Sequence, residues 1–164
     1  MNLSSSTPSP FDVRRLKELI GSQRICMFTE PQRDGSLTSR PMTVLGIDKA
    51  GALWFMTSIE HLPHADWPVS AAFANEDANR FVSVTGIAQA VQDSERIHEL
   101  WSVMCRPWFP MGPDSPEIVL IRLAPDQVEF WEGPSNPLAR GASLLASVVA
   151  RRPIGLGEHG RLNL

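Results

Sequence analysis

Arg40 and the pair Thr57-Ser58 are the residues of this 164-residue chain best suited by type to hold a charged ligand. Arg40 stands beside Pro41 in a strand-like segment, and Thr57-Ser58 ends the next such segment. A guanidinium can bind a phosphate through two parallel N–H donors, and hydroxyls can add further hydrogen bonds. The pattern indicates a phosphate-binding site. The alternative is an exposed surface arginine and an ordinary strand end.

Two further groups of residues could do chemistry. Trp108-Phe109 lies in a loop rich in Pro and Gly, where an aromatic ring can stack on a planar ligand, pack in the core or fill a subunit interface. His61, His64 and Asp66 are a weak metal constellation, because Pro63 separates the histidines and no further ligand has suitable spacing. We expect no metal site. The chain has no G-x-S-x-G elbow and no Walker loop.

Charge and composition limit the possible partners. The chain has 15 Lys and Arg against 18 Asp and Glu, a formal charge of −3, and its basic residues are scattered, which argues against nucleic-acid binding. We expect no membrane span, because no apolar stretch is long enough, and the polar start is unlike a secretory signal. Cys26 and Cys105 lack disulfide or zinc spacing, which favours free thiols in a reducing cytoplasm.

Two helices are expected outside the strands. The first begins at Pro10 and ends at Gly21, with Val13, Leu16 and Ile20 on one face. The second opens at Asp93-Ser94-Glu95 and ends near Arg106-Pro107. Its apolar face consists of Ile97, Leu100, Trp101 and Met104. His98 is expected at the surface.

The strand pattern predicts a mainly β (α+β) domain, an antiparallel barrel or sandwich with peripheral helices. Six segments are expected as strands: residues 24–29, 37–47, 52–57, 69–75, 79–91 and 117–131, the last interrupted at Pro125-Asp126. Pro41 suggests an edge, a bulge or a ligand-facing position, and Gly86 suggests coiling or a close backbone approach. We expect a barrel domain at residues 1–136, then an extension at 137–164 with a helix over 138–151 and a polar tail.

Several segments, in order along the chain, resemble the pyridoxamine 5′-phosphate oxidase-like FMN-binding split-barrel family, specifically its bacterial general stress protein branch. They are SRPM (39–42), LWFMTS (53–58), NRFVSVTG (79–86), Trp101 with WFP (108–110), EFWEGP (129–134) and GEHG (157–160). The resemblance covers the chain from about Val13 onward. It implies a six-stranded Greek-key split barrel that forms a homodimer with FMN in clefts between the subunits.

The resemblance also assigns roles to particular residues. Arg40, Thr57 and Ser58 would hold the FMN phosphate. The isoalloxazine would be lined by Pro41, Met42 and Thr43 and by Trp54, Phe55 and Met56. Asn79, Arg80, Trp108 and Phe109 would complete the pocket, partly from the second subunit.

One departure concerns the phosphate. The family carries a lysine shortly after the Thr-Ser step, whereas this chain continues SIEHLPH from Ser58. His61 or His64 could replace the lysine, but a neutral imidazole is a weaker partner for an anion. The alternative to tight FMN binding is therefore weak FMN binding or a different ligand in the cleft.

Three functions follow from these observations. The chain is an FMN-binding stress-response-type protein, with oxidoreductase activity from a nicotinamide donor to a small-molecule partner as one possibility. Alternatively it is a split-barrel reductase for another planar cofactor, a deazaflavin or haem, or a non-catalytic dimer acting as a sensor or scaffold. No residue stands out as an obligatory catalytic acid or base.

Overall fold

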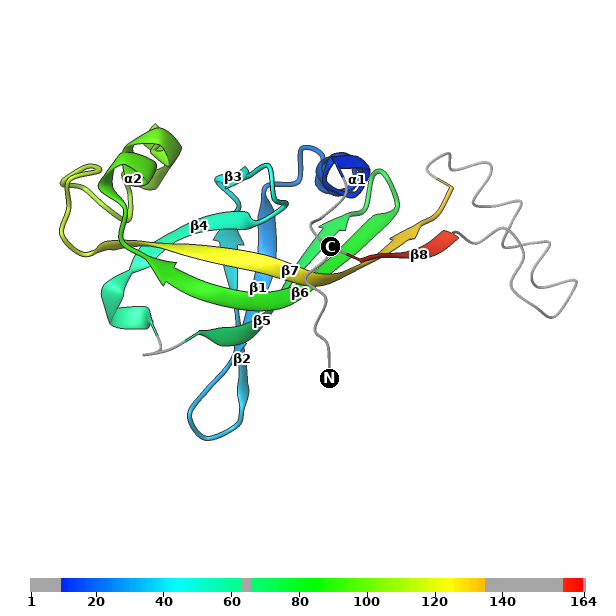
Figure 1. Cartoon of the computed structure of the whole chain (residues 1–164), viewed down its shortest axis with the longest axis horizontal. Helices are drawn as coiled ribbons and strands as arrows, with labels where there is room; N and C mark the ends of the chain where they lie inside the picture. Colours follow the sequence, from blue (N-terminus) through cyan, green and yellow to red (C-terminus); the bar gives the residue numbers. More distant parts are fainter. Residues whose placement is uncertain (1–9, 63–65, 135–157, 164) are drawn as a thin grey trace, which may run out of the picture.

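An antiparallel sheet that curls into a half-barrel forms the body of the protein (Figure 1). The computed structural model describes residues 10–62, 66–134 and 158–163. The predicted mainly β fold is confirmed. The strands are β1 (Ile25–Pro31), β2 (Leu37–Thr43), β3 (Gly46–Ile47), β4 (Leu53–Ser58), β5 (Trp67–Asn75), β6 (Arg80–Val91), β7 (Ile118–Glu132) and β8 (Glu158–Asn163). The helices are α1 (Pro10–Ile20) and α2 (Ser94–Leu100), with single 3-10 turns η1 (Ile59–His61) and η2 (Val103–Cys105).

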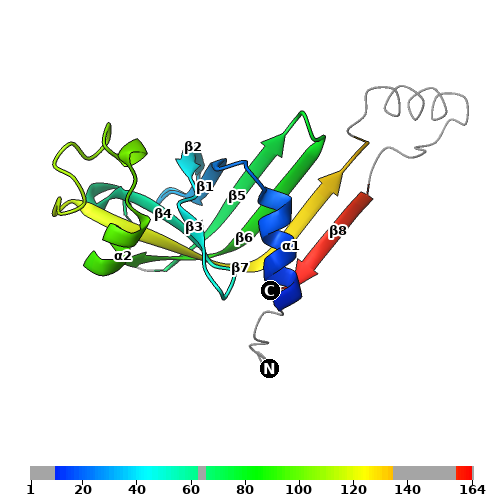
Figure 2. The same cartoon turned by 90° about the horizontal axis from the view of Figure 1, so that it is seen from above.

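The strand order brings the two ends of the sheet toward each other. The order is β2-β1-β5-β6-β7-β4-β3, and β8 adds to the far half of β7. Strands β2 and β4 stand near opposite ends of this order, yet they are in contact, so the sheet encloses a core (Figure 2). Phe28 of β1 and Phe55 of β4 meet in that core edge to face, with ring centroids 5.2 Å apart. Because both rings are fully buried, they join the two ends of the sheet.

Helix α1 closes one side of the core, as its sequence predicts. It begins at Pro10 and ends before Gly21, whose φ of +55° suits a glycine at a helix end. The predicted stripe of Val13, Leu16 and Ile20 is buried. A helix of this length depends on such packing, because it is too short to persist alone in water.

Two predicted strands differ from the observed ones. The segment predicted at 37–47 divides into β2 and β3, because the chain leaves β1 after Thr43 and the Leu45 amide donates to the Trp54 carbonyl (2.8 Å). Strand β7 continues through Pro125, with a bulge that leaves Asp126 unpaired. Of the three positions predicted for Pro41, an edge, a bulge or a ligand-facing position, the edge is observed, since β2 is at the end of the strand order.

Gly86 lies opposite that bulge, and the predicted close backbone approach is confirmed. Gly86 pairs with Pro125, while its neighbour Thr85 pairs with Gln127. A Cβ at Gly86 would overlap the carbonyl oxygen of Ala124 and lie 2.9 Å from Pro125 Cα. Glycine is therefore required for β6 and β7 to coil together at this point.

Helix α2 is shorter than predicted. It ends at Leu100, where Trp101 takes an extended conformation, and η2 is a separate turn. Ile97, Leu100 and Trp101 pack into a second apolar cluster, but Met104 is exposed. The apolar spacing therefore continued past the end of the helix and predicted a longer element.

The C-terminal tail contributes a strand that its polar sequence did not predict. Strand β8 pairs with β7 from Gln127 to Glu132. His159 stacks on Trp131 at a centroid distance of 5.0 Å, and Arg161 pairs with Glu129. This part of the expected extension therefore belongs to the sheet. The helix expected over 138–151 lies outside the described residues.

Both cysteines are free and buried, and within the described ranges no helix is long and apolar enough to cross a membrane. Burial raises the pKa of the Cys26 thiol from 9.0 to about 12. Because the unfolded thiol ionises at lower pH than the folded one, the resulting stability is full below about pH 9 and is lost as pH rises toward 12.

We therefore expect the free energy of unfolding to fall more steeply between pH 9 and 11 in the wild type than in Cys26→Ala. Denaturant titrations at pH 7, 9 and 11 measure this difference. Equal slopes in the two proteins would show that the buried Cys26 thiol does not contribute to alkaline sensitivity.

Candidate functional site

Arg40 points to the core side of β2. Strand alternation places Arg40 with Met42 on the side that faces Phe28 of β1. The Arg40 side chain is 26% exposed, and its Nη2 lies 3.2 Å from Oε1 of Glu30. That contact lacks the alignment of a hydrogen bond. Among the described residues, Nε and Nη2 of Arg40 are buried and have no hydrogen-bond partner.

Glu30 is the residue of the site that the sequence analysis missed. It is 7% exposed, and its Oε2 accepts a hydrogen bond from Nε1 of Trp67 at 3.0 Å. The alternation of β1 could have indicated that Glu30 is buried, because it places Cys26, Phe28 and Glu30 on the same side of the strand. A carboxylate at the third position of that buried side requires a polar partner.

The two Arg40 donors without a hydrogen-bond partner have the form of an anion site. Nε and Nη2 lie on the same edge of the guanidinium and can donate to two oxygens of one ligand. Leaving a buried donor without an acceptor costs about 1–3 kcal/mol, so an acceptor is expected at this edge. A phosphate or carboxylate supplies the required pair of oxygens.

Thr57 and Ser58 lie on opposite sides of β4. Thr57 is buried on the core side, like Phe55, whereas Ser58 shares the other side with Met56. Strand alternation places Thr57 and Arg40 on the core side, and the antiparallel strand order places the ends of β1 and β4 at the same end of the barrel. Ser58 Oγ is buried and has no hydrogen-bond partner in the described ranges. Only one of the two hydroxyls therefore shares the side that Arg40 faces.

The residues predicted to line a ring fall into two groups. Pro41 and Thr43 present exposed side chains on the outer side of β2. The side chains of Met42, Trp54 and Phe55 are buried, and Met56 is half-buried. The Trp54 indole donates to Asp48 Oδ2 (3.1 Å) and has the Arg96 guanidinium 5.0 Å from its ring centre. Because their rings are packed inside the chain, Trp54 and Phe55 do not offer a ligand their side chains.

Asn79 and Arg80 lie at the turn between β5 and β6. Asn79 has a φ of +48°, and its carbonyl accepts from the Gly133 amide (2.9 Å). Arg80 Nε pairs with Glu132 at 2.7 Å, and Arg80 Nη1 donates to the Glu18 carbonyl at the end of α1 (3.1 Å). These contacts give Arg80 a structural role.

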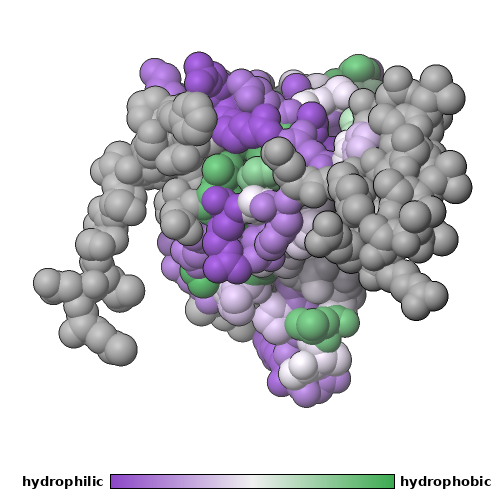
Figure 3. Space-filling view, turned by 90° about the vertical axis from the view of Figure 1, so that its right-hand side faces the viewer, coloured by the Kyte–Doolittle hydropathy of each residue, from purple (hydrophilic) through white to green (hydrophobic). Residues whose placement is uncertain are grey.

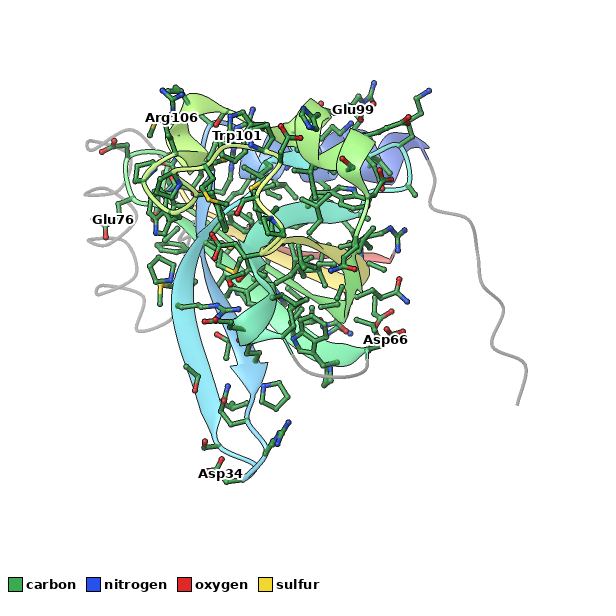
Figure 4. All side chains as sticks on the ribbon, turned by 90° about the vertical axis from the view of Figure 1, so that its left-hand side faces the viewer. Asp34, Asp66, Glu76, Glu99, Trp101 and Arg106 are labelled. Carbon is green, nitrogen blue, oxygen red and sulfur yellow. The ribbon has the colours of Figure 1, made fainter. Side chains whose placement is uncertain are left out.

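Trp108 and Phe109 lie far from that turn. Trp108 is 70% exposed, and Phe109 is buried beside Trp54 in the second apolar cluster. In Figures 1 and 2 the loop between α2 and β7 and the β5–β6 turn lie toward opposite ends of the long axis. In Figure 4, Trp101 and Arg106, from the α2 end, lie on the opposite side from Asp34 at the tip of the β1–β2 hairpin. A single copy therefore does not bring Asn79 and Trp108 together.

The histidines show no metal centre in the part of the chain that the structure describes. No group of three potential ligands occurs there, and Asp66 accepts a hydrogen bond from Gln89 Nε2 (2.8 Å). His64 and the side chain of His61 lie outside the described residues, so the metal expectation is not tested. His98 is exposed, as predicted, and lies 2.8 Å from Asp114 Oδ1.

Comparison with known proteins shows the family. The pyridoxamine 5′-phosphate oxidase-like family matches residues 12–153, so the chain belongs to it and the resemblance in sequence is confirmed. No curated protein matches.

Solved structures of general stress proteins have the same fold. The general stress FMN/FAD binding protein from Xanthomonas citri is 27% identical, with 78% of this chain and 92% of that one covered and a TM-score of 0.65. General stress protein 26 from Bacillus anthracis is 21% identical, with coverage of 72% and 92% and a TM-score of 0.59. A protein from Clostridium acetobutylicum related to general stress protein 26 is 18% identical, with coverage of 76% and 90% and a TM-score of 0.62.

Proposed function

We propose that this protein binds FMN and that the Nε–Nη2 edge of Arg40 holds the phosphate. The observation that carries the proposal is the pair of buried donors on Arg40 without a hydrogen-bond partner among the described residues. The buried Thr57, on the core side of β4, is the hydroxyl residue on the side that Arg40 faces. The related protein from Xanthomonas citri is described as binding FMN or FAD, which supports a flavin as the ligand.

The absorption spectrum of the purified protein tests flavin binding. A flavin spectrum whose chromophore is released by denaturation supports the proposal. If the protein is colourless, added FMN should raise its melting temperature. A colourless protein whose melting temperature does not respond to FMN contradicts it.

We propose that the functional unit is a homodimer. Every second residue of β2, β1, β5 and β6 faces the outer side of the sheet. None of these outward-facing residues, from Ser39 of β2 to Ile87 of β6, is charged. Met27 is 45% exposed at its centre, between Pro41 of β2 and Ala72 of β5. An uncharged sheet face of this kind is suited to a second copy of the chain.

A second group of exposed apolar side chains, at the α2 end of the molecule, also supports a dimer. It lies in the segment after α2 and consists of Val103, Met104, Trp108 and Met111. By contrast, the side of the molecule seen in Figure 3 shows hydrophilic residues over much of its described upper surface, with only small hydrophobic areas. A dimer would also supply the separated residues Asn79 and Trp108 from different subunits to one pocket.

Replacing Met27 with Glu is expected to dissociate the dimer, because it places a charge at the centre of the uncharged face. Light scattering after size exclusion gives the mass, with Lys17→Glu on the exposed side of α1 as the control. A dimeric Met27→Glu protein would show that the second copy binds elsewhere, and a monomeric wild type would contradict the dimer itself.

We propose that any turnover is flavin-dependent electron transfer from a nicotinamide donor, because FMN can accept a hydride and pass electrons on. The protein's own residues bind and orient the cofactor. The contact between Arg40 and Glu30 favours the second candidate, a non-catalytic dimer with weak FMN binding, because that cation is already neutralised. Oxidation of a nicotinamide donor by the FMN-loaded protein, measured against free FMN, distinguishes the two.

A further inference from the structure

We propose that Glu30 is a specificity-determining residue that lowers the affinity of the Arg40 site for a dianionic phosphate. The inference deepens the proposed function and rests on it. It predicts how ligand affinity depends on the charge of the group bound at Arg40, whereas the proposed function is that a flavin binds.

The geometry places Glu30 beside the edge of Arg40 that a phosphate would use. Glu30 Oε1 lies 3.2 Å from Nη2, one of the two donors without a hydrogen-bond partner in the described part of the chain. An oxygen accepting from Nη2 would stand about 2.9 Å from that nitrogen. Phosphate and carboxylate would therefore share one guanidinium at close range, with two like charges facing each other.

The Glu30 carboxylate is held at this position and cannot readily turn away. Its Oε2 accepts from Trp67 Nε1 at 3.0 Å, and the Trp67 ring is buried in the core. The Glu30 side chain is 9% exposed, so water screens it poorly. The negative charge is therefore fixed next to Arg40 by β1 and β5 together.

The local charge balance then depends on the ligand. Arg40 and Glu30 sum to zero, and the chain has no lysine in SIEHLPH after Ser58 to add a second cation. A group with two negative charges leaves an excess of negative charge at the pair, whereas a neutral hydroxyl leaves none. The site therefore prefers FMN over riboflavin less strongly than it would if Arg40 had no carboxylate beside it.

Binding of FMN and riboflavin to the wild type and to Glu30→Gln tests the inference. Flavin fluorescence titrations are expected to show FMN binding about tenfold tighter in Glu30→Gln, a change of about 1.4 kcal/mol, with riboflavin affinity unchanged. Glu30→Ala, a second variant without the carboxylate, should change the FMN affinity in the same direction. Glu18→Gln, which removes one charge from an exposed ion pair of α1, is the matched control and should change neither affinity.

A second measurement separates the role of Glu30 from the proposed flavin function. Inorganic phosphate should raise the melting temperature of Glu30→Gln more than that of the wild type, whether or not a flavin binds. Unchanged FMN affinity in a folded Glu30 variant, or an equal response to phosphate, overturns the inference. If FMN binds to neither protein, the proposed flavin function is wrong, and the phosphate response alone supports or overturns the role of Glu30.

Discussion

Replacing Arg40 with Ala is expected to weaken FMN binding about tenfold to a hundredfold while leaving riboflavin binding nearly unchanged. Arg40 supplies the two buried donors that have no hydrogen-bond partner among the described residues. Charge-assisted hydrogen bonds contribute about 1.5–3 kcal/mol, which corresponds to that loss of affinity. Riboflavin lacks the phosphate and so does not depend on these donors. Titration of both flavins into both proteins measures the difference.

The Arg40 variant needs a control for folding, because it leaves the buried Glu30 carboxylate without its cation. Removing one partner of a buried pair destabilises the protein, here by about 1–3 kcal/mol because Arg40 remains partly exposed. The double variant Arg40→Ala, Glu30→Gln removes both charges and should recover much of that stability without recovering FMN affinity. Arg40→Lys keeps the charge but loses the paired donors, and an intermediate affinity is expected. Equal loss of FMN and riboflavin in folded Arg40→Ala would place the phosphate elsewhere.

Replacing Gly86 with Ala is expected to destabilise the protein by about 3 kcal/mol or more, the upper part of the range for overpacking. The added Cβ would overlap the backbone of Ala124 and lie against Pro125, and backbone cannot move aside as a flexible side chain can. The bulge between β6 and β7 would have to open, and with it the centre of the sheet. Denaturant unfolding of both proteins gives the change in free energy.

Gly46→Ala is the matched control for Gly86→Ala. A Cβ at Gly46 would meet only the end of the Leu100 side chain, at 3.2 Å, which can shift by a few tenths of an ångström. We expect a loss well below that of Gly86→Ala. Similar stabilities for the two variants would show that the bulge tolerates a side chain and that Gly86 is not required for coiling.

Local patterns predicted most of the fold. The strand at 79–91, the apolar stripe of α1 and the mid-strand Gly86 can each be recognised within a few residues of sequence, and each was confirmed. Strand β8 was not predicted, because its polar residues show no strand pattern of their own. They form a strand by pairing with the exposed edge of β7. The length of α2 was overestimated because apolar spacing continues beyond Leu100 although the backbone turns.

The candidate site was predictable only in part. Arg40 could be singled out by its type and by its neighbour Pro41, but its partner Glu30 comes from another strand, through a pairing that depends on the folded register. The alternation of β4 also separates Thr57 from Ser58, which adjacency in sequence concealed. The roles predicted for Asn79 and Trp108 stay predictions, because they require residues from opposite ends of the chain's long axis to meet across two subunits.

The most direct test of the central claim is a crystal structure of the protein with FMN. Phosphate oxygens are expected within hydrogen-bond distance of both Nε and Nη2 of Arg40, with Glu30 still bound to Trp67. A phosphate held by other residues, or a flavin bound with the Nε–Nη2 edge of Arg40 left empty, would contradict it.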